Sequence, residues 1–232
     1  MMHAWRDALE AMAALLAQES PAMLSFSLAR EVQDALPFYW RKFKVIPGYT
    51  YLLDLSSTIG EIEANMASVR RRNLSKASRD GLSVRRIADL SVVHDLVLAT
   101  FDRQDVRISR HYIERILFDF ANEFNSFAFA TYRDNTPIAC TFVVHDRVTA
   151  YYLLGGYTAG EKHHGAGPLA MFAAIMHAKG LGLAAFDFEG SMIPTIERYF
   201  RGFGGRLTPY FTVNKAWLPI EIVLKFIKRE SF

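Results

Sequence analysis

In some segments of this chain the hydrophobic residues recur every three to four positions, and in others at every second position. The first pattern predicts helices and the second predicts strands. Residues 4–18 place apolar side chains at helical spacing, so we expect an amphipathic helix that ends before Pro21. In the middle of the chain, pairs of turn residues separate three strand-like runs, which predicts an antiparallel meander. The predicted strands are residues 127–132, 138–144 and 148–157, with turns at Asp134-Asn135 and Asp146-Arg147.

Shorter elements are predicted on both sides of the meander. The order of a meander followed by a strand–helix–strand crossover indicates an α/β fold with a mixed, mostly antiparallel sheet flanked by helices. Before the meander we expect strand 23–26, helix 28–36, strand 49–55, a long helix 58–79, strand 82–87 and helices 91–101 and 109–123. After it we expect helix 168–179, strand 184–189, helix 193–203, strand 206–214 and an amphipathic helix at 219–228.

Composition narrows the class of protein. Of the 232 residues, 51% are hydrophobic and 13% aromatic, which is typical of a globular protein with a sizeable core. The net charge of +3 is compatible with anionic ligands. The single cysteine, Cys140, excludes an intrachain disulfide, and its strand-like surroundings favour an inert buried thiol. No apolar run approaches the ~20 residues of a membrane span, so a cytoplasmic protein is expected.

A glycine-rich loop precedes the predicted helix at Pro168. Gly165 and Gly167 stand directly before this proline, and Lys162 adds a cation. The N-terminus of a helix presents unpaired N–H groups and partial positive charge, so the loop would suit an anion such as phosphate. A tight turn in which the glycines only relieve strain explains the same spacing equally well.

The predicted strand Ala185 to Glu189 carries two carboxylates. Its period of two places Asp187 and Glu189 on one face and two phenylalanines on the other. On a central strand this face would line a polar site, because unpaired buried carboxylates are costly. On an edge strand the two would be ordinary solvated charges; we favour the site.

A run of basic residues lies on the predicted helix 58–79. Arg72, Lys76 and Arg79 fall on one helical face at spacings of four and three. A solvated surface is the commoner explanation of such a run. The functional alternative is a basic wall for the phosphates of a nucleotide, a tRNA or a glycan-lipid precursor.

Two sequence motifs carry a family resemblance over residues 37–215. The pattern Lys162-x-x-Gly165-x-Gly167 resembles the pyrophosphate loop of the GNAT acyltransferases. The run Phe186-Asp187-Phe188-Glu189-Gly190-Ser191, followed by residues 196–200 and 203–205, resembles the GNAT-fold branch of the Fem peptidoglycan aminoacyltransferases. The resemblance implies a GNAT-like domain at 81–215, after a connecting basic helix at 58–80. It implies that residues 1–57 are the last half of a preceding GNAT-like unit whose first four strands are absent, and that 216–232 form a C-terminal amphipathic helix.

The resemblance also implies an activity and a set of site residues. It indicates an N-acyltransferase that moves an acyl group from acyl-CoA, or a similar phosphopantetheine thioester, to an amine. Glu189, with Asp187 beside it, is the candidate base, and we expect burial to raise its pKa. The family's acidic tyrosine precedes a Gly-Phe pair by four residues, where this chain has Phe200, so Tyr199 is either re-aimed or that acid is missing. The expected donor-binding residues are Leu154, Gly155, Gly156, Lys162, His163, His164, Gly165, Ala166 and Gly167.

Two other functions remain open from the sequence. A Fem-like aminoacyltransferase would use aminoacyl-tRNA and a cell-wall precursor, which Arg72, Lys76 and Arg79 would attract. A catalytically silent binding module would explain both the displaced tyrosine and the short N-terminal half. No metal is expected, because no third ligand at metal spacing accompanies His163 and His164.

Overall fold

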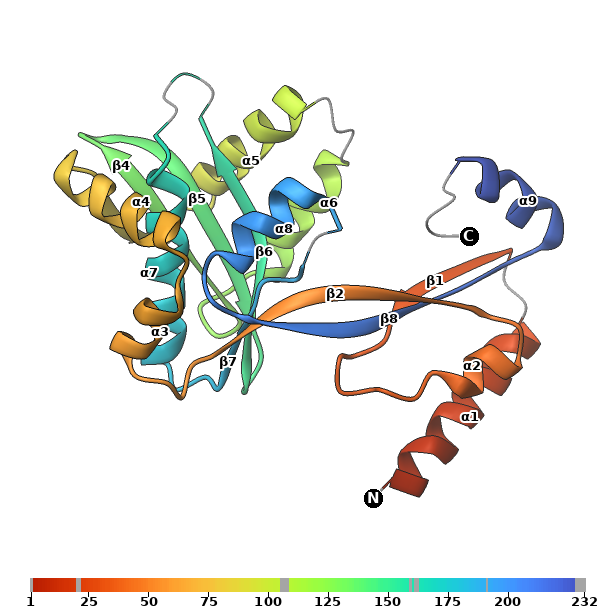
Figure 1. Ribbon diagram of the computed structural model, residues 1–232. Helices are drawn as coiled ribbons and strands as arrows, with labels where there is room; N and C mark the ends of the chain where they lie inside the picture. The colour runs from red at the N-terminus through yellow and green to blue at the C-terminus, as the bar shows by residue number, and fades with distance from the viewer. Residues whose placement is uncertain are drawn as a thin grey trace. The chain divides into compact units, whose positions relative to one another are not determined.

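The structure is a computed structural model, and it describes residues 2–19, 22–104, 109–158, 160, 163–190 and 192–227. The chain divides into two compact units, residues 51–207 and residues 1–50 together with 208–232. This division differs from the four consecutive segments expected from the sequence, because a late strand returns to pair with the first one. Figure 1 labels most of the elements of both units.

The larger unit is built on a sheet with the strand order β2-β7-β6-β5-β4-β3. Strands β6 and β7 are parallel and the other neighbours are antiparallel, so the predicted meander and mixed sheet are confirmed. The parallel pair is joined through a helix, as a crossover connection requires. The strands are β2 Lys44–Asp54, β3 Ser83–Ile87, β4 Ser126–Arg133, β5 Thr136–His145, β6 Thr149–Tyr157 and β7 Ala185–Asp187.

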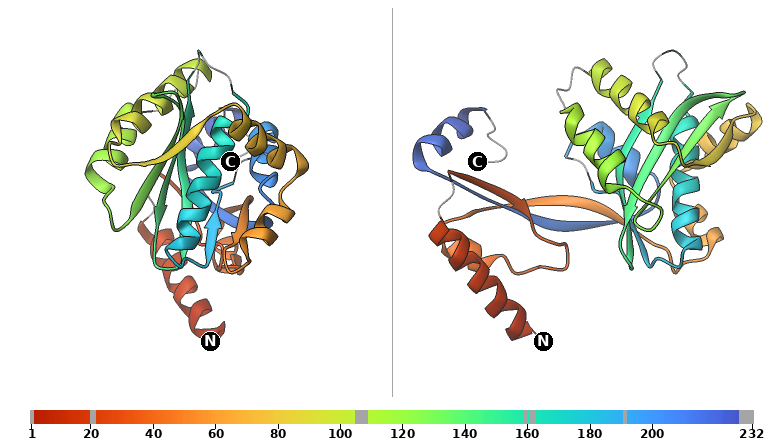
Figure 2. Two further views of the ribbon diagram at one scale, coloured as in Figure 1. Left: turned by 90° about the vertical axis from the view of Figure 1, so that its left-hand side faces the viewer. Right: turned by 180° about the vertical axis from the view of Figure 1, so that it is seen from behind.

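Helices cover both faces of this sheet (Figure 2, left). Helices α5 Ser91–Gln104 and α6 Arg110–Glu114 bury one face around Val97 and Phe142. Helix α7 Ala166–Gly180 buries the other face, where Met171 packs with aromatic residues of β7 and its flanks. The remaining helices of the unit are α3 Ile59–Asn65, α4 Ser68–Arg79, the π-helical η1 Arg115–Phe120 and α8 Pro194–Arg201.

The single long helix predicted at 58–79 is wrong, because the chain breaks between α3 and α4. Met66 and Ala67 both adopt extended backbone angles. The Met66 side chain is buried, and the Ala67 N–H donates to the carbonyl of Gly202 at 3.0 Å. Arg71, from the basic run, donates to the carbonyls of residues 63, 64 and 66 and so caps the end of α3. These distant contacts override a continuous helical pattern.

Other helices and strands begin or end at residues that differ from the predicted ones. Helix α7 begins two residues before Pro168, and a proline within the first helical turn is still tolerated. The predicted helix 109–123 is α6 followed by a π-helical turn, in which Ala121 N–H donates to the carbonyl of Ile116 at 3.0 Å. Strand β2 starts five residues before its predicted first residue, at Lys44.

The smaller unit contains α1 Met2–Glu19, β1 Met23–Ser27 and α2 Leu36–Trp40, together with the outer parts of β2 and β8 and the last helix, α9. Strand β1 pairs antiparallel with β8, and Phe38 lies at the centre of the core. The helix predicted at 28–36 is wrong: a helix forms after that segment instead, with Pro37 in its first turn. No helix of the described residues is long and apolar enough to cross a membrane. The remaining bounds are β8 Arg206–Ala216 and α9 Leu218–Ile227.

Candidate active site

Strands β6 and β7 diverge after a short parallel ladder. The ladder joins Thr149–Tyr151 to Ala185–Asp187. Beyond it β6 continues to Tyr157, whereas β7 ends at Asp187. Among the described residues, no strand therefore pairs with this edge of β6 after Tyr151. The Tyr157 N–H and carbonyl bond to side chains of α5, so the segment between Tyr151 and Tyr157 is the part of this edge with which a ligand would pair.

A β-bulge lies at the start of the diverging part of β6. Phe142 is paired with Leu154 and Val143 with Tyr152, so Leu153 is the extra residue. Bulges re-aim a strand, and this one coincides with the point where β6 leaves β7.

Gly155 and Gly156 face different surroundings. A Cβ on Gly156 would lie 2.4 Å from the Leu96 carbonyl carbon, so this glycine admits the backbone of α5. A Cβ on Gly155 would lie 1.9 Å from the Tyr152 hydroxyl, on the other face of the sheet. Leu154 is buried in the core beneath α5. Of the three predicted donor-binding residues that lie on β6, Gly155 is the one that faces Tyr152.

The N-terminus of α7 lies within the expected phosphate loop. Gly165 is its N-cap, and the Ala166 N–H donates to the His163 carbonyl at 3.0 Å. Pro168 has no N–H, and the Leu169 N–H donates to the Gly165 carbonyl. Among the described residues, the Gly167 N–H is therefore the donor of the first turn that remains for a ligand. This N–H and the helix dipole favour an anion there. Lys162 lies outside the described residues.

Close packing explains two of the small residues in this loop. A Cβ on Gly165 would lie 2.4 Å from the Asn73 carbonyl oxygen and 2.8 Å from the Ala77 Cβ, so Gly165 lets α7 approach α4. The buried Thr131 hydroxyl donates to the Ala166 carbonyl at 2.8 Å. The first turn of α7 is thus fixed by both α4 and β4.

His163 is a structural link rather than an exposed loop residue. Its side chain is only 5% exposed, and its Nε2 lies 2.9 Å from Asp80 Oδ2. Its Nδ1 accepts the Gly165 N–H at 3.1 Å, so in the neutral ring Nε2 carries the proton. Lys76 also contacts Asp80, at 2.6 Å, and the two partners lower the pKa of Asp80 to about 2. His164, by contrast, is exposed.

Tyr199 reaches the N-terminus of α7 from helix α8. A Cβ on Gly167 would lie 3.4 Å from its hydroxyl oxygen. The Arg70 guanidinium lies 4.3 Å from the centre of its ring. Burial raises the pKa of Tyr199, whereas the charge of Arg70 lowers it. The neighbouring Phe200 is buried against Phe188, 5.6 Å away, so Tyr199 faces the loop although its offset in the sequence differs from the family pattern.

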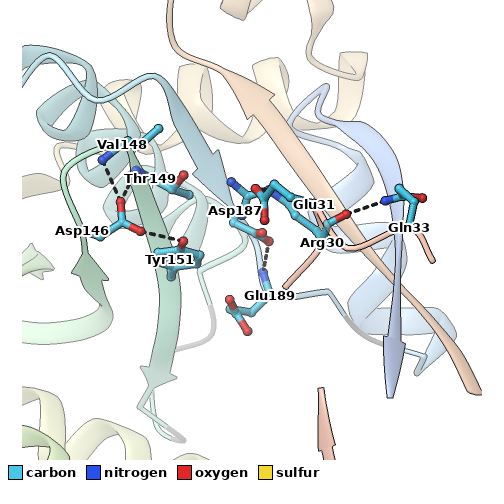
Figure 3. A network of polar contacts seen from close by, with 9 residues as sticks. All are labelled: Arg30, Glu31, Gln33, Asp146, Val148, Thr149, Tyr151, Asp187 and Glu189. Atoms are coloured by element: carbon cyan, nitrogen blue, oxygen red, sulfur yellow. Dashed lines mark hydrogen bonds and ion pairs between the residues drawn. The ribbon is translucent and has the colours of Figure 1, made fainter. Parts of the chain in front are cut away.

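The two carboxylates at the end of β7 do not share a strand face. The strand ends at Asp187, so the predicted strand to residue 189 is wrong. Asp187 is 4% exposed, and its Oδ1 accepts the Glu189 N–H at 2.9 Å (Figure 3). Glu189 is exposed, so the expectation that it is buried is wrong. Its φ of 57° is left-handed, and such backbone strain clusters at functional sites.

Sequence reasoning missed three residues around this site. Tyr152 points its hydroxyl at Gly155, and burial raises its pKa. Tyr51 of β2 donates to Glu197 of α8 at 2.5 Å, which fastens α8 to the sheet. Arg70 stands inside the basic run but contacts Tyr199, 129 positions away. The aromatic run and the basic run were visible in the sequence, but their partners were not.

The basic residues of α4 divide into those that bond within the fold and those that do not. Arg70 and Arg71 are used within the fold, and Lys76 is paired with Asp80. Arg72 and Arg79 are exposed. Of the three residues predicted to form a basic wall, two therefore remain as exposed cations outside an ion pair. In the described part of the chain, no three His, Cys, Asp or Glu side chains gather as metal ligands.

The chain was compared with known proteins. In structure it is similar to FemX, with a TM-score of 0.71 and 12% identity over 97% of this chain and 79% of that one. It is similar to L-PGS from Bacillus licheniformis, with a TM-score of 0.59 and 11% identity over 89% of this chain and 71% of that one. It is also similar to a GCN5-related N-acetyltransferase from Kribbella flavida, with a TM-score of 0.53 and 12% identity over 86% and 70% of the two chains.

The structural likenesses establish a shared fold, at identities too low to transfer a substrate. No curated protein sequence matches the chain. The family model described as an acetyltransferase (GNAT) domain matches residues 65–201, more than half of the 232 residues. This match spans α4 to α8 and so contains the strand divergence, the loop and Tyr199. The chain therefore belongs to the acetyltransferase (GNAT) domain family.

Proposed function

We propose that this protein is an N-acyltransferase that moves an acyl group from acyl-CoA, or a similar phosphopantetheine thioester, to an amine. The supporting observation is the divergence of β6 from β7 next to the free N-terminus of α7. Phosphate would bind at the first turn of α7, and the pantetheine arm would lie along the unpaired edge of β6. The thioester would then reach the end of β7, where Asp187 and Glu189 lie.

The proposed reaction has two proton transfers, one to Glu189 after the end of β7 and one from Tyr199 beside the first turn of α7. The amine nitrogen attacks the thioester carbonyl, a C–N bond forms, and the carbonyl electron pair moves to oxygen. Glu189, directly or through a water, takes the proton that the amine loses. When the intermediate collapses, the C–S bond breaks and Tyr199 gives its hydroxyl proton to the sulfur. Asp187 accepts the Glu189 N–H and thereby holds the turn that aims Glu189.

Donor binding is tested by calorimetry with acetyl-CoA and longer acyl-CoAs. Gly167→Ala places a methyl group at the first turn of α7, where it meets only the Tyr199 hydroxyl at 3.4 Å. We expect this variant to keep its melting temperature and to bind the donor about tenfold more weakly. Gly180→Ala is the matched control, because it lies at the other end of α7 with no atom within 4 Å. The CoA proposal is refuted by a wild-type protein that binds no acyl-CoA in the millimolar range.

A second candidate function is transfer of an aminoacyl group from aminoacyl-tRNA to a cell-wall precursor. The exposed Arg72 and Arg79 on α4, and the shared fold with FemX, favour it. Binding of tRNA would weaken steeply with salt, and Arg72→Gln with Arg79→Gln would flatten that dependence. Arg115→Gln is the control, because this exposed arginine lies near Asp119 on η1. A salt-independent affinity removes this candidate, and one reproducible turnover with an amine removes a catalytically silent role.

A further inference from the structure

Arg70 differs from the rest of the basic run because its guanidinium lies inside the unit. Its charge stands 4.3 Å from the ring centre of Tyr199 and 5.5 Å from that of Phe203. Its Nε donates to the Tyr199 carbonyl at 3.4 Å. Burial lowers the pKa of Arg70, and no carboxylate of the described residues acts on its guanidinium. A half-buried cation is costly, and the aromatic faces offset part of that cost.

The surroundings of Arg70 are shaped to hold it in this place. A Cβ on Gly202 would lie 2.9 Å from both Cγ and Nε of Arg70, so only glycine leaves room there. With its amide oriented to satisfy both ends, Asn73 accepts from the Arg70 guanidinium at 3.0 Å and donates to the Val69 carbonyl at 3.2 Å. The backbone carbonyl of the same Asn73 packs against Gly165, the N-cap of α7. Arg70 is thus joined both to Tyr199 and to the helix end that Tyr199 faces.

We propose that Arg70 is a positioning residue, which holds the Tyr199 hydroxyl beside Gly167 and supplies the positive charge that faces the tyrosine ring. The proposal rests on the proposed function, in which Tyr199 is the acid. When Tyr199 gives its proton to the leaving sulfur, the O–H bond breaks, an S–H bond forms and negative charge remains on the phenol oxygen. Arg70 stabilises that charge until a proton returns from solvent.

The other charged and titratable groups around Tyr199 are few and can be named. Tyr152 interacts with it from β6; burial, Tyr199 itself and Cys140 of β5 raise the pKa of Tyr152, so neither Tyr152 nor Cys140 supplies a positive charge to Tyr199. On α8, the helix that carries Tyr199, Glu197 accepts a hydrogen bond from Tyr51 and forms an ion pair with Arg201. Among the described residues, Arg70 is the cation within stacking distance of the Tyr199 ring.

The kinetic test compares Arg70→Met, Arg70→Lys and a control stack. Arg85→Met is the control, because Arg85 lies 4.5 Å from the ring centre of Tyr132 on the distant strands β3 and β4. In Arg70→Met we expect kcat to fall about tenfold with donor KM within a factor of two, since misplacing a catalytic group has costs of this order. Arg70→Lys should recover part of the loss, to a kcat about threefold below wild type, and Arg85→Met should change neither constant. Wild-type kcat in Arg70→Met, or no recovery in Arg70→Lys, overturns the proposal.

A second measurement needs no substrate and so separates this proposal from the proposed function. All tyrosines are replaced by 3,5-difluorotyrosine, which titrates at lower pH, and the ¹⁹F signal of residue 199 is assigned by its loss in Tyr199→Phe. Removing a facing cation disfavours the phenolate, so Arg70→Met should raise the titration midpoint by roughly half a pH unit or more. Arg85→Met should leave it in place. An unmoved midpoint in Arg70→Met overturns the proposal, even if acyl transfer is observed.

Two outcomes separate the acid role of Tyr199 from the positioning role of Arg70. If Tyr199→Phe turns over as fast as wild type, the acid role fails, while the shifted midpoint still establishes the contact with Arg70. If Arg70→Met does not fold, Arg70→Lys carries the test, because it keeps the charge and loses the planar contact with the Tyr199 carbonyl. Its ¹⁹F midpoint should then remain near that of wild type while kcat falls about threefold; an unchanged kcat overturns the proposal.

Discussion

The two sides of the β6–β7 divergence are built in different ways. On the α7 side, close contacts set the geometry: Gly165 admits α4, Gly202 admits the Arg70 side chain, and His163 is fixed by Asp80. On the β7 side, the strand stops after three residues and continues as a turn in which Glu189 is exposed and left-handed. The first side is a packed scaffold, whereas the second presents a side chain to solvent.

Because the α7 side is packed and the turn after β7 is exposed, a substitution should affect stability on the first side and turnover alone on the second. On the α7 side, a larger residue at a packed position such as Gly165 displaces atoms that have no room to move, so it should weaken folding and donor binding together. Changes at the β7 turn replace a side chain that packs little, so they should leave folding intact. Four variants test this contrast, in order of decreasing expected effect.

The largest effect is expected from Gly165→Val on the packed side. Its Cβ would lie 2.4 Å from the Asn73 carbonyl oxygen, and overpacking of this kind typically costs about 1–3 kcal/mol. We expect a lower unfolding free energy in urea denaturation and donor binding too weak for calorimetry. Gly160→Val is the control, because no atom lies within 4 Å of its Cβ. Equal stability of the two variants would contradict the packing described at α4.

Glu189→Gln should act on turnover alone. Loss of a general base typically lowers kcat by ~100-fold or more. Because Glu189 is exposed, we expect the melting temperature and the donor Kd to stay at wild-type values. Glu63→Gln, an exposed glutamate on α3, serves as the control. Unchanged turnover in the Glu189 variant would show a solvated charge and remove the proposed base.

Tyr199→Phe should have a smaller effect on the same reaction. A thiolate leaves more readily than an alkoxide, so loss of the acid should lower kcat about tenfold, at the low end of acid catalysis. The stacking with Arg70 is kept, because the ring remains. Steady-state kinetics with an acyl-CoA measures the change, and the control is Tyr132→Phe, at another tyrosine that stacks on an arginine. A kcat equal to that of the control would exclude an acid role for Tyr199.

The smallest effect concerns the link from α4 to the loop and depends on pH. The folded-state pKa of Asp80 is depressed to about 2 by Lys76 and His163, so its contribution to stability is complete above the ordinary pKa of about 3.9. That contribution is lost as pH falls from about 4 toward 2. The melting temperature of wild type should therefore exceed that of Asp80→Asn by a constant amount at pH 5–7, and the difference should vanish at lower pH. A difference as large at pH 2 as at pH 5–7 would point to packing instead of charge.

Much of the fold could be read from the sequence because its signals are local. The period of the meander, the turn residues Asp134 and Asp146, and the proline near the start of α7 act within a few residues, and the structure agrees with each. The motifs around Gly165 and Phe186 indicated the family for the same reason, because the residues that carry them are close in the chain.

Contacts between distant residues decided the rest. The break between α3 and α4 depends on the Ala67 N–H reaching Gly202, and the orientation of Tyr199 depends on Arg70. The end of β7 at Asp187 follows from the turn at Glu189. A hydrophobic pattern states which face of an element is buried, but not which atom lies opposite. The tertiary structure therefore placed the site residues, because packing brings together groups more than a hundred positions apart.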